Sequence, residues 1–233
     1  MSSKYFGNTC EQSVAIIRGN GSNMANYKLP FTLYSDCYVR SEMGSAESVV
    51  RAKRGEVYYL DSAAANINNA TIYFYPAKAF STIGSIEGGR IGGYAPEQID
   101  LSNAIKLREI VVSTQGDGLV NTSLKNSFDV QNNNILEKLY IANLTAYTDK
   151  LDLSGCTNLR MVDARNSTFT EISIANNAPV ESLLLHNPTV LILSNLYNLK
   201  TFNIGNFNRL ETLNINNIDE NEAKDLNGLP INS

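Results

Sequence analysis

The chain has 233 residues, of which 43% are hydrophobic and 18% are charged, and its formal net charge is −4. This length is enough for one or two domains with a real core. The charge balance offers no basic stripe for nucleic acid, and no apolar stretch approaches the roughly 18 residues of a membrane span. We therefore expect neither a nucleic-acid-binding protein nor a membrane-spanning one.

The N-terminal segment predicts a small β domain over residues 1–90. Its first eight residues lack an apolar run after a basic segment, so no secretory signal is expected. Five glycines between residues 84 and 93 indicate a junction and place the boundary near residue 90. Stretches rich in Tyr, Val, Ile and Phe predict strands of an antiparallel sheet or sandwich. They are 13–18, 28–34, 37–40, 48–53, 56–60 and 71–76.

The second domain, residues 91–233, repeats one phrase: apolar-x-apolar-x-Asn. Five pairs of starts lie eleven residues apart, and the second member of each pair has another apolar residue three positions before it. Leu213 also has one, Leu210, so we group it with the second members. The starts are Ile99, Ile110, Phe128, Leu139, Leu151, Val162, Ile172, Leu183, Leu191, Phe202 and Leu213, of which Ile110 and Leu151 lack the Asn.

The recurrence of this phrase along the chain predicts a stacked-repeat fold. One coil of chain takes about 19–29 residues, which overlaps the leucine-rich-repeat period of roughly 20–29. Because alternation of apolar residues is the strand period, each phrase predicts a short strand with one buried face. The fold class that we expect is mainly β: a small N-terminal β domain followed by an atypical leucine-rich-repeat β-solenoid with parallel sheets.

The Asn of the phrase is predicted to lie on the core side of its strand, because residues i, i+2 and i+4 share one face. A buried amide at the strand end can bond backbone groups of neighbouring coils. We expect a structural ladder of stacked amides, and the alternative is that the Asn is only a turn residue. The ladder comprises Asn143, Asn166, Asn187, Asn206 and Asn217.

Residues that carry chemistry are sparse. His186 is the only histidine and has no Cys near it, so a metal site is not expected. The glycine-rich run at 88–93 lacks the Lys-Ser/Thr of a phosphate-binding loop, and no GxSxG motif occurs. Cys10, Cys37 and Cys156 are isolated and odd in number, which argues against a disulfide framework. We expect no catalytic, cofactor-binding or metal-binding residues; an enzyme built on the N-terminal domain is the remaining alternative.

In the strands predicted for the second members of the pairs, the outward-facing positions predict a contact surface. Three apolar side chains form a stripe there, and charged and imidazole side chains flank it. A rimmed apolar patch is typical of protein-contact sites, although an ordinary solvated sheet face is the alternative. The candidate protein-contact face is Tyr140, Met161, Asp163, Arg165, Leu184 and His186.

The residues after the last phrase predict that the final coil needs a cap. A stacked-repeat protein requires a cap over its last coil, yet the chain turns polar after Asn217. The residues that follow contain few aliphatic side chains: Ile218, Leu226, Leu229 and Ile231. Three alternatives stay open: this segment folds over the end, the natural polypeptide continues, or a partner covers the end.

The repeat region resembles the atypical leucine-rich repeats of large virion proteins from crAss-like and related gut bacteriophages. The likeness covers roughly residues 70–217 and includes the run LDLSGCTNLRMVDARNSTFTEISI at 151–174. Shorter runs add to it: FSTIGSIEG at 80–88, IDLSNAIKLREI at 99–110, NILEKLYIAN at 134–143 and PVESLLL at 179–185. The Asn falls one place earlier than in the common LxxLxLxxN pattern, so a standard horseshoe with a helical convex side is not implied.

The resemblance implies a structural protein of the virion tail, such as the muzzle or tail hub, present in several copies. Its implied partners are other virion tail proteins and copies of itself, and a host surface ligand is a further candidate. Adhesins of the bacterial cell surface that contain leucine-rich repeats look similar as well. A cell-surface binding module is therefore the alternative function and location.

Overall fold

The structure is a computed structural model, and its described residues are 15–19, 30–43, 46–55, 58–59, 70–75, 79–83, 85–86, 89–90, 98–111, 128–142, 149–186, 188–205 and 208–216. The chain is mainly β, as predicted, and the elements of the described residues are all β-strands. Within these residues, no helix has the length and apolar character needed to cross a membrane.

The first six described strands of the chain each fall within or overlap a stretch predicted to be one, whereas three further described strands before residue 91 were not predicted. Antiparallel pairing joins β4 to β3, β3 to β6, β6 to β1, and β5 to β2, so the predicted antiparallel arrangement is confirmed. The strands are β1 (Ala15–Gly19), β2 (Pro30–Leu33), β3 (Cys37–Met43), β4 (Ala46–Ala52), β5 (Tyr58–Tyr59) and β6 (Ala70–Tyr75).

The rest of the chain alternates between two sets of strands. All eleven predicted phrases begin inside a strand. The first set is β10 (Gln98–Asp100), β12 (Phe128–Asp129), β14 (Leu151–Leu153), β16 (Glu171–Ile174), β18 (Val190–Ser194) and β20 (Thr212–Asn216). The second set is β7 (Phe80–Ile83), β11 (Glu109–Val111), β13 (Lys138–Tyr140), β15 (Met161–Asp163), β17 (Ser182–Leu184) and β19 (Thr201–Asn203). A short hairpin, β8 (Ser85–Ile86) and β9 (Gly89–Arg90), lies between β7 and β10 in the chain.

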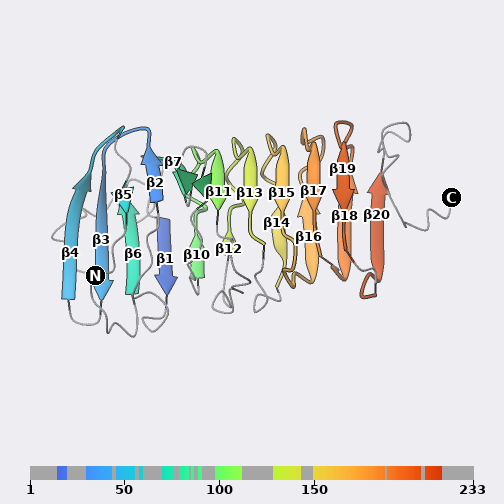
Figure 1. The fold of residues 1–233 in the computed structure, drawn as a ribbon, viewed down its shortest axis with the longest axis horizontal. Helices are drawn as coiled ribbons and strands as arrows, with labels where there is room; N and C mark the ends of the chain where they lie inside the picture. Colours follow the sequence, from blue (N-terminus) through green and yellow to red (C-terminus); the bar gives the residue numbers. More distant parts are fainter. Residues whose placement is uncertain are drawn as a thin grey trace.

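Within each set, successive strands pair in parallel, except that β12 and β14 of the first set belong to different sheets. The second set forms the order β7-β11-β13-β15-β17-β19, and the first set pairs β10 with β12 and runs β14-β16-β18-β20. Equivalent residues of the phrase stand side by side, so that Leu139 faces Val162 and Val162 faces Leu183. Figure 1 shows the strands side by side in a long row from β4 at one end to β20 at the other. The predicted parallel pairing is confirmed for these strands.

One assignment within the repeat was wrong. Leu213, grouped with the second members because Leu210 precedes it, lies in β20, which pairs with β18 of the first set. The backbone N–H groups of Glu211 and Thr212 donate to the carbonyl of Thr189, the residue before β18. An apolar residue three positions before the phrase therefore does not by itself identify the second set.

Strands from both sides of residue 90 share two sheets. β1 pairs with β10 in antiparallel fashion, and β7 pairs with β11 in parallel, so that Ile83 faces Ile110. β7 was not recognised as a repeat strand, although Phe80 precedes Ile83 by the same three positions that separate Leu107 from Ile110. The domain boundary near residue 90 stays a prediction.

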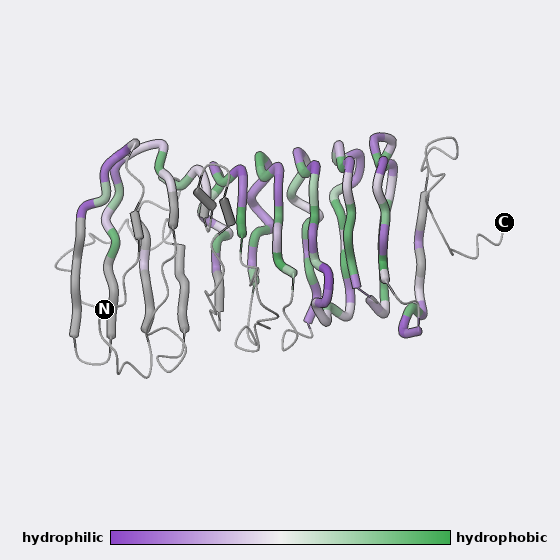
Figure 2. The backbone as a smooth tube through the Cα atoms, viewed as in Figure 1, coloured by the Kyte–Doolittle hydropathy of each residue, from purple (hydrophilic) through white to green (hydrophobic). Residues whose placement is uncertain are grey.

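The core lies between the two sets of strands and follows the predicted alternation. Ile110, Leu139, Val162 and Leu183, one from each successive strand of the second set, are each 0% exposed. Figure 2 shows hydrophobic and hydrophilic residues alternating along the repeat region. Burial of this column decreases at β19, the last described strand of the second set, where Phe202 is only partly buried.

A short polar side chain ends many of the strands. Asp or Asn in the strand accepts a hydrogen bond from the backbone N–H two residues on, which is the geometry of an Asx turn. This contact satisfies a donor that would otherwise continue the strand, and so the chain turns. The pairs are Asp100 with Ser102, Asp129 with Gln131, Asp152 with Ser154, Asp163 with Arg165, and Asn203 with Gly205.

Neighbouring coils approach so closely at one turn that only glycine fits. A Cβ added to Gly155 would lie 1.6 Å from the carbonyl oxygen of Gln131, in the preceding coil. Since that atom belongs to the backbone, it cannot move aside as a flexible side chain would. The stack is therefore packed backbone against backbone at this turn.

Leu183 and Leu184 offer a matched test of the strand phase. We expect Leu183→Asn to lower the free energy of unfolding by about 3–5 kcal/mol, because it removes buried apolar volume and buries an amide. Leu184→Asn should cost about 1 kcal/mol or less, since the next strand has Asn203 at the paired position. Chemical denaturation of both variants measures this difference, and equal losses would show that the phase is wrong.

Candidate interaction surface

The six residues of the candidate protein-contact face lie on, or just after, neighbouring strands of the second set. Tyr140 of β13, Asp163 of β15 and Leu184 of β17 are paired in register, so they form one row across the sheet. The hydroxyl of Tyr140 also lies 3.1 Å from the sulfur of Met161. Arg165 and His186 are not in the strands themselves and lie two residues after the ends of β15 and β17. Met161 lies outside this row, since it pairs with Lys138 and Ser182.

Two of the six are not surface residues, which corrects the prediction. Tyr140 is 8% exposed and Asp163 is 1% exposed. The guanidinium of Arg165 covers Asp163 and donates to both of its carboxylate oxygens, at 2.9 and 2.8 Å. Alternation predicted that the Asp163 side chain points away from the core, but it could not predict that a neighbouring side chain would bury it.

The row is open only toward the C-terminal strands. Val111 of β11 is buried like Tyr140 and Asp163, whereas Leu184 is half-buried and Asn203 is exposed. His186, beside Leu184, is also half-buried. A macromolecular contact on this face is therefore better placed over β17 and β19 than over β13 and β15.

The core-side position predicted for the Asn ladder is contradicted at Asn166, although the amides of two other phrase asparagines do bond, with Nδ2 of Asn195 donating to Oδ1 of Asn176 at 2.6 Å. Asn166 is exposed and has a φ of 56°, so its side chain is not part of the core. Asn tolerates this left-handed conformation better than most residues, and the alternative, a turn residue, holds for Asn166. The other four members, Asn143, Asn187, Asn206 and Asn217, lie outside the described residues.

Buried polar bonds between coils do exist, but at residues that the sequence reasoning missed. The amide of Asn133 donates to the carbonyl of Leu101 at 3.1 Å, and the hydroxyl of Ser167 donates to the carbonyl of Ile141 at 2.7 Å. The thiol of Cys156 makes the corresponding contact with Val130 at 3.5 Å. Each donor lies three residues after the second apolar residue of its phrase, one place later than the Asn of the phrase. That position has no constant residue type, so no repeated letter marked it.

Five charged residues of alternating sign precede the strands of the second set. We call Arg108, Glu137, Arg160, Glu181 and Lys200 the charge row. Ion pairs join Arg108 to Glu137, Arg160 to Glu181 at 3.0 Å, and Lys200 to Glu181 at 3.1 Å. Each residue directly follows one of the apolar residues that precede the second phrases, so the row was readable from the sequence.

Electrostatics along the charge row favour this order of coils. Lys200, and then Arg160, hold the pKa of the Glu181 carboxyl below its ordinary value of 4.5. At the other end of the row, Arg108 also donates from Nε to the hydroxyl of Tyr34 at 2.9 Å, which ties the row to the N-terminal strands. Exposed pairs of this kind contribute little individually, but a misplaced coil would bring like charges together.

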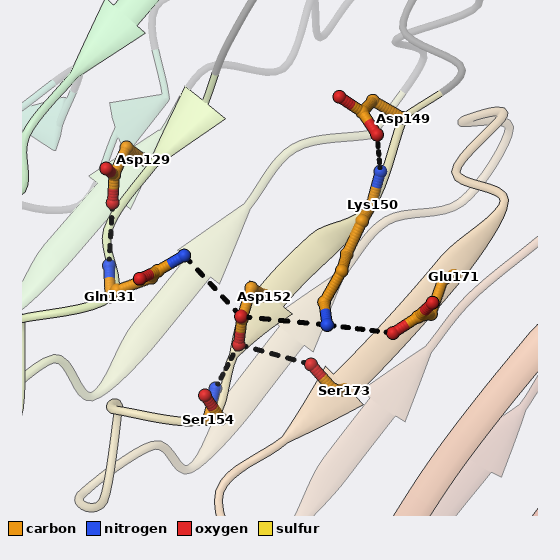
Figure 3. Close-up of polar contacts among 8 residues, drawn as sticks. All are labelled: Asp129, Gln131, Asp149, Lys150, Asp152, Ser154, Glu171 and Ser173. Atoms are coloured by element: carbon orange, nitrogen blue, oxygen red, sulfur yellow. Dashed lines mark hydrogen bonds and ion pairs between the residues drawn. The ribbon is translucent and has the colours of Figure 1, made fainter.

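A second polar network links the first set of strands (Figure 3). The ammonium of Lys150 lies 2.8 Å from Glu171 and 3.7 Å from Asp152. Asp152 in turn accepts from the hydroxyl of Ser173 on β16 and from the side-chain amide of Gln131 after β12, at 3.2 and 3.5 Å. Polar contacts therefore connect successive coils on both faces of the molecule.

The two described cysteines are poor nucleophiles. Burial raises the pKa of the Cys37 and Cys156 thiols to about 12, so neither forms a thiolate near neutral pH. No group of three or more His, Cys, Asp and Glu side chains suited to a metal ion occurs among the residues that the structure describes.

The ion pairs of the charge row can be tested by reversing the charges of Arg160, Glu181 and Lys200. We expect Glu181→Lys, which places three cations together, to lower the midpoint of thermal unfolding. The triple variant Arg160→Glu, Glu181→Lys, Lys200→Glu restores the alternation within the group and should recover most of the loss. Because salt screens exposed charges, the difference should shrink in high salt. A triple variant no more stable than Glu181→Lys would contradict the pairing.

The lowered pKa of Glu181 predicts a defined pH dependence. A carboxyl whose pKa is depressed by folding contributes stability above its ordinary pKa of 4.5 and loses that contribution as pH falls through the lowered value. We expect the native chain to be more stable than Glu181→Gln at neutral pH and the two to converge in acid. Thermal unfolding over this pH range measures the gap, and a constant gap would refute the assignment.

Comparisons with known proteins identify no relative of this chain: no protein-family model matches it, and neither a curated protein nor a solved structure matches it.

Proposed function

We propose that the repeat region is a β-solenoid of an atypical leucine-rich-repeat type and that the chain is a structural protein of a bacteriophage tail. In this role it has no enzyme activity and acts as an assembly scaffold. The observation that carries the proposal is the pair of parallel strand sets, which advance by one phrase per strand along a single row (Figure 1). Folds of this kind present long surfaces to other macromolecules.

The choice of a virion rests on the sequence. The runs at 151–174 and 99–110 are similar to repeats of tail-associated virion proteins such as the muzzle or tail hub. Such proteins bind copies of themselves and other tail proteins, and they can display a surface to the host. The half-buried Leu184 and His186, together with the exposed charge row, supply polar and apolar contacts for a protein partner.

A cell-surface adhesin with leucine-rich repeats is the competing function, and location separates the two. The test is quantitative mass spectrometry of purified virions and of envelope fractions from uninfected host cells. We expect peptides of this chain in the virions at a fixed ratio to other tail proteins. Their absence from virions and presence in the envelopes of uninfected cells would overturn the proposal in favour of the adhesin.

A further inference from the structure

Among the residues that the structure describes, the two strand sets end unevenly. The first set ends with β20, which pairs with β18, whereas the second set ends with β19, which pairs with β17. In every earlier coil, a strand of the first set is followed by one of the second set that extends the other sheet. Among the described residues, no strand occupies the corresponding place beside β19, after β20.

Within the described part of the chain, the backbone beside β19 has hydrogen-bonding groups without partners on that side. After β13, β15 and β17, the backbone N–H groups of Ile141, Ala164 and Leu185 each donate to a carbonyl of the next strand. Ile204 is next in this series, and its N–H has no acceptor among the described residues. Unpaired groups of this kind on a strand edge are a template for another strand.

The carbonyls at the other end of the strand follow the same rule. The carbonyls of Glu137, Arg160 and Glu181 each accept from two backbone N–H groups of the following coil. Lys200 is the next residue in the series, and within the described part of the chain its carbonyl has no such donors. One strand thus offers an acceptor at Lys200 and a donor at Ile204, in the spacing that every earlier strand uses.

The side chains at this edge are partly uncovered. Phe202 continues the column of Ile110, Leu139, Val162 and Leu183, but it is half-buried where those four are fully buried. The side chain of Lys200 is 66% exposed while it pairs with Glu181 on its inner side. The edge therefore combines an apolar side chain, a cation and backbone groups that have no partner among the described residues.

We propose that the β19 edge binds an extended segment of a partner protein as an additional parallel strand. The segment reads apolar-acidic-x-apolar, with its carboxylate beside Lys200 and its last apolar residue against Phe202. The acidic residue follows from the charge row, in which sign alternates at every step from Arg108 to Lys200. Such an added strand gains affinity from main-chain bonds and specificity from alternate side chains.

This inference deepens the proposed function, because it gives the site and the chemistry of a partner contact. The two proposals can fail separately. A chain absent from virions would still have the β19 edge, and an edge that binds nothing would leave the virion location untouched.

The test uses the full chain and a labelled synthetic peptide. The peptide APVESLLLHN copies residues 178–187, whose Glu pairs with cations on both sides in the native stack. Fluorescence anisotropy measures binding of the peptide to the chain. Hydrogen exchange of the Ile204 backbone amide shows whether the peptide binds at the β19 edge. We expect saturable binding and slower exchange at Ile204. A peptide with the Glu changed to Lys should bind about fivefold more weakly, or worse.

Charge reversal on the protein supplies the matched control. Lys200→Glu should weaken the native peptide and restore binding of the Lys peptide, a result that loss of folding cannot produce. No saturable binding, binding that ignores both charge changes, or protection away from Ile204 would each overturn the proposal. Concentration-dependent protection of Ile204 in the chain alone would instead assign the edge to a second copy and overturn the partner segment.

Discussion

Each short strand of this chain can bury its apolar face only when neighbouring strands stack beside it in parallel and in register. Strands of two to five residues, such as β12 and β18, are too short to be stable alone. Leu139, Val162 and Leu183 are fully buried because they stand in one row, each flanked by the equivalent residue of the next strand. A slip by one residue would turn this row outward, so register determines the core.

Polar groups enforce the register with unequal strength. A buried donor that loses its acceptor costs about 1–3 kcal/mol, so the contacts from Asn133 to Leu101 and from Ser167 to Ile141 penalise any shift of a coil. The exposed ion pairs of the charge row are individually weak, but their alternation opposes a wrong order of coils. Asn133 also has an unpaired side-chain oxygen, and the structure gives no physical account of it.

Alternation and spacing predicted the strands of the eleven phrases and the buried column of the second set, but they assigned Leu213 of β20 to the wrong set. They did not predict the turn geometry, because Asn166 takes a left-handed conformation that points its side chain to solvent. Nor did they predict that Arg165 would bury Asp163, since that contact depends on how one turn folds back. The pairing of β7 with β11 and the charge row were both readable, but each needed positions outside the phrase itself.

Cysteine cross-linking tests the register most directly, in a chain whose three native cysteines are changed to serine. Ser182 and Thr201 are paired in register on β17 and β19, so their Cα atoms should lie about 4.8 Å apart, within disulfide range. We expect Ser182→Cys with Thr201→Cys to form an intramolecular disulfide readily. Ser182→Cys with Asn203→Cys, at roughly 8 Å, should not. Preferential cross-linking of the second pair would contradict the in-register parallel stack.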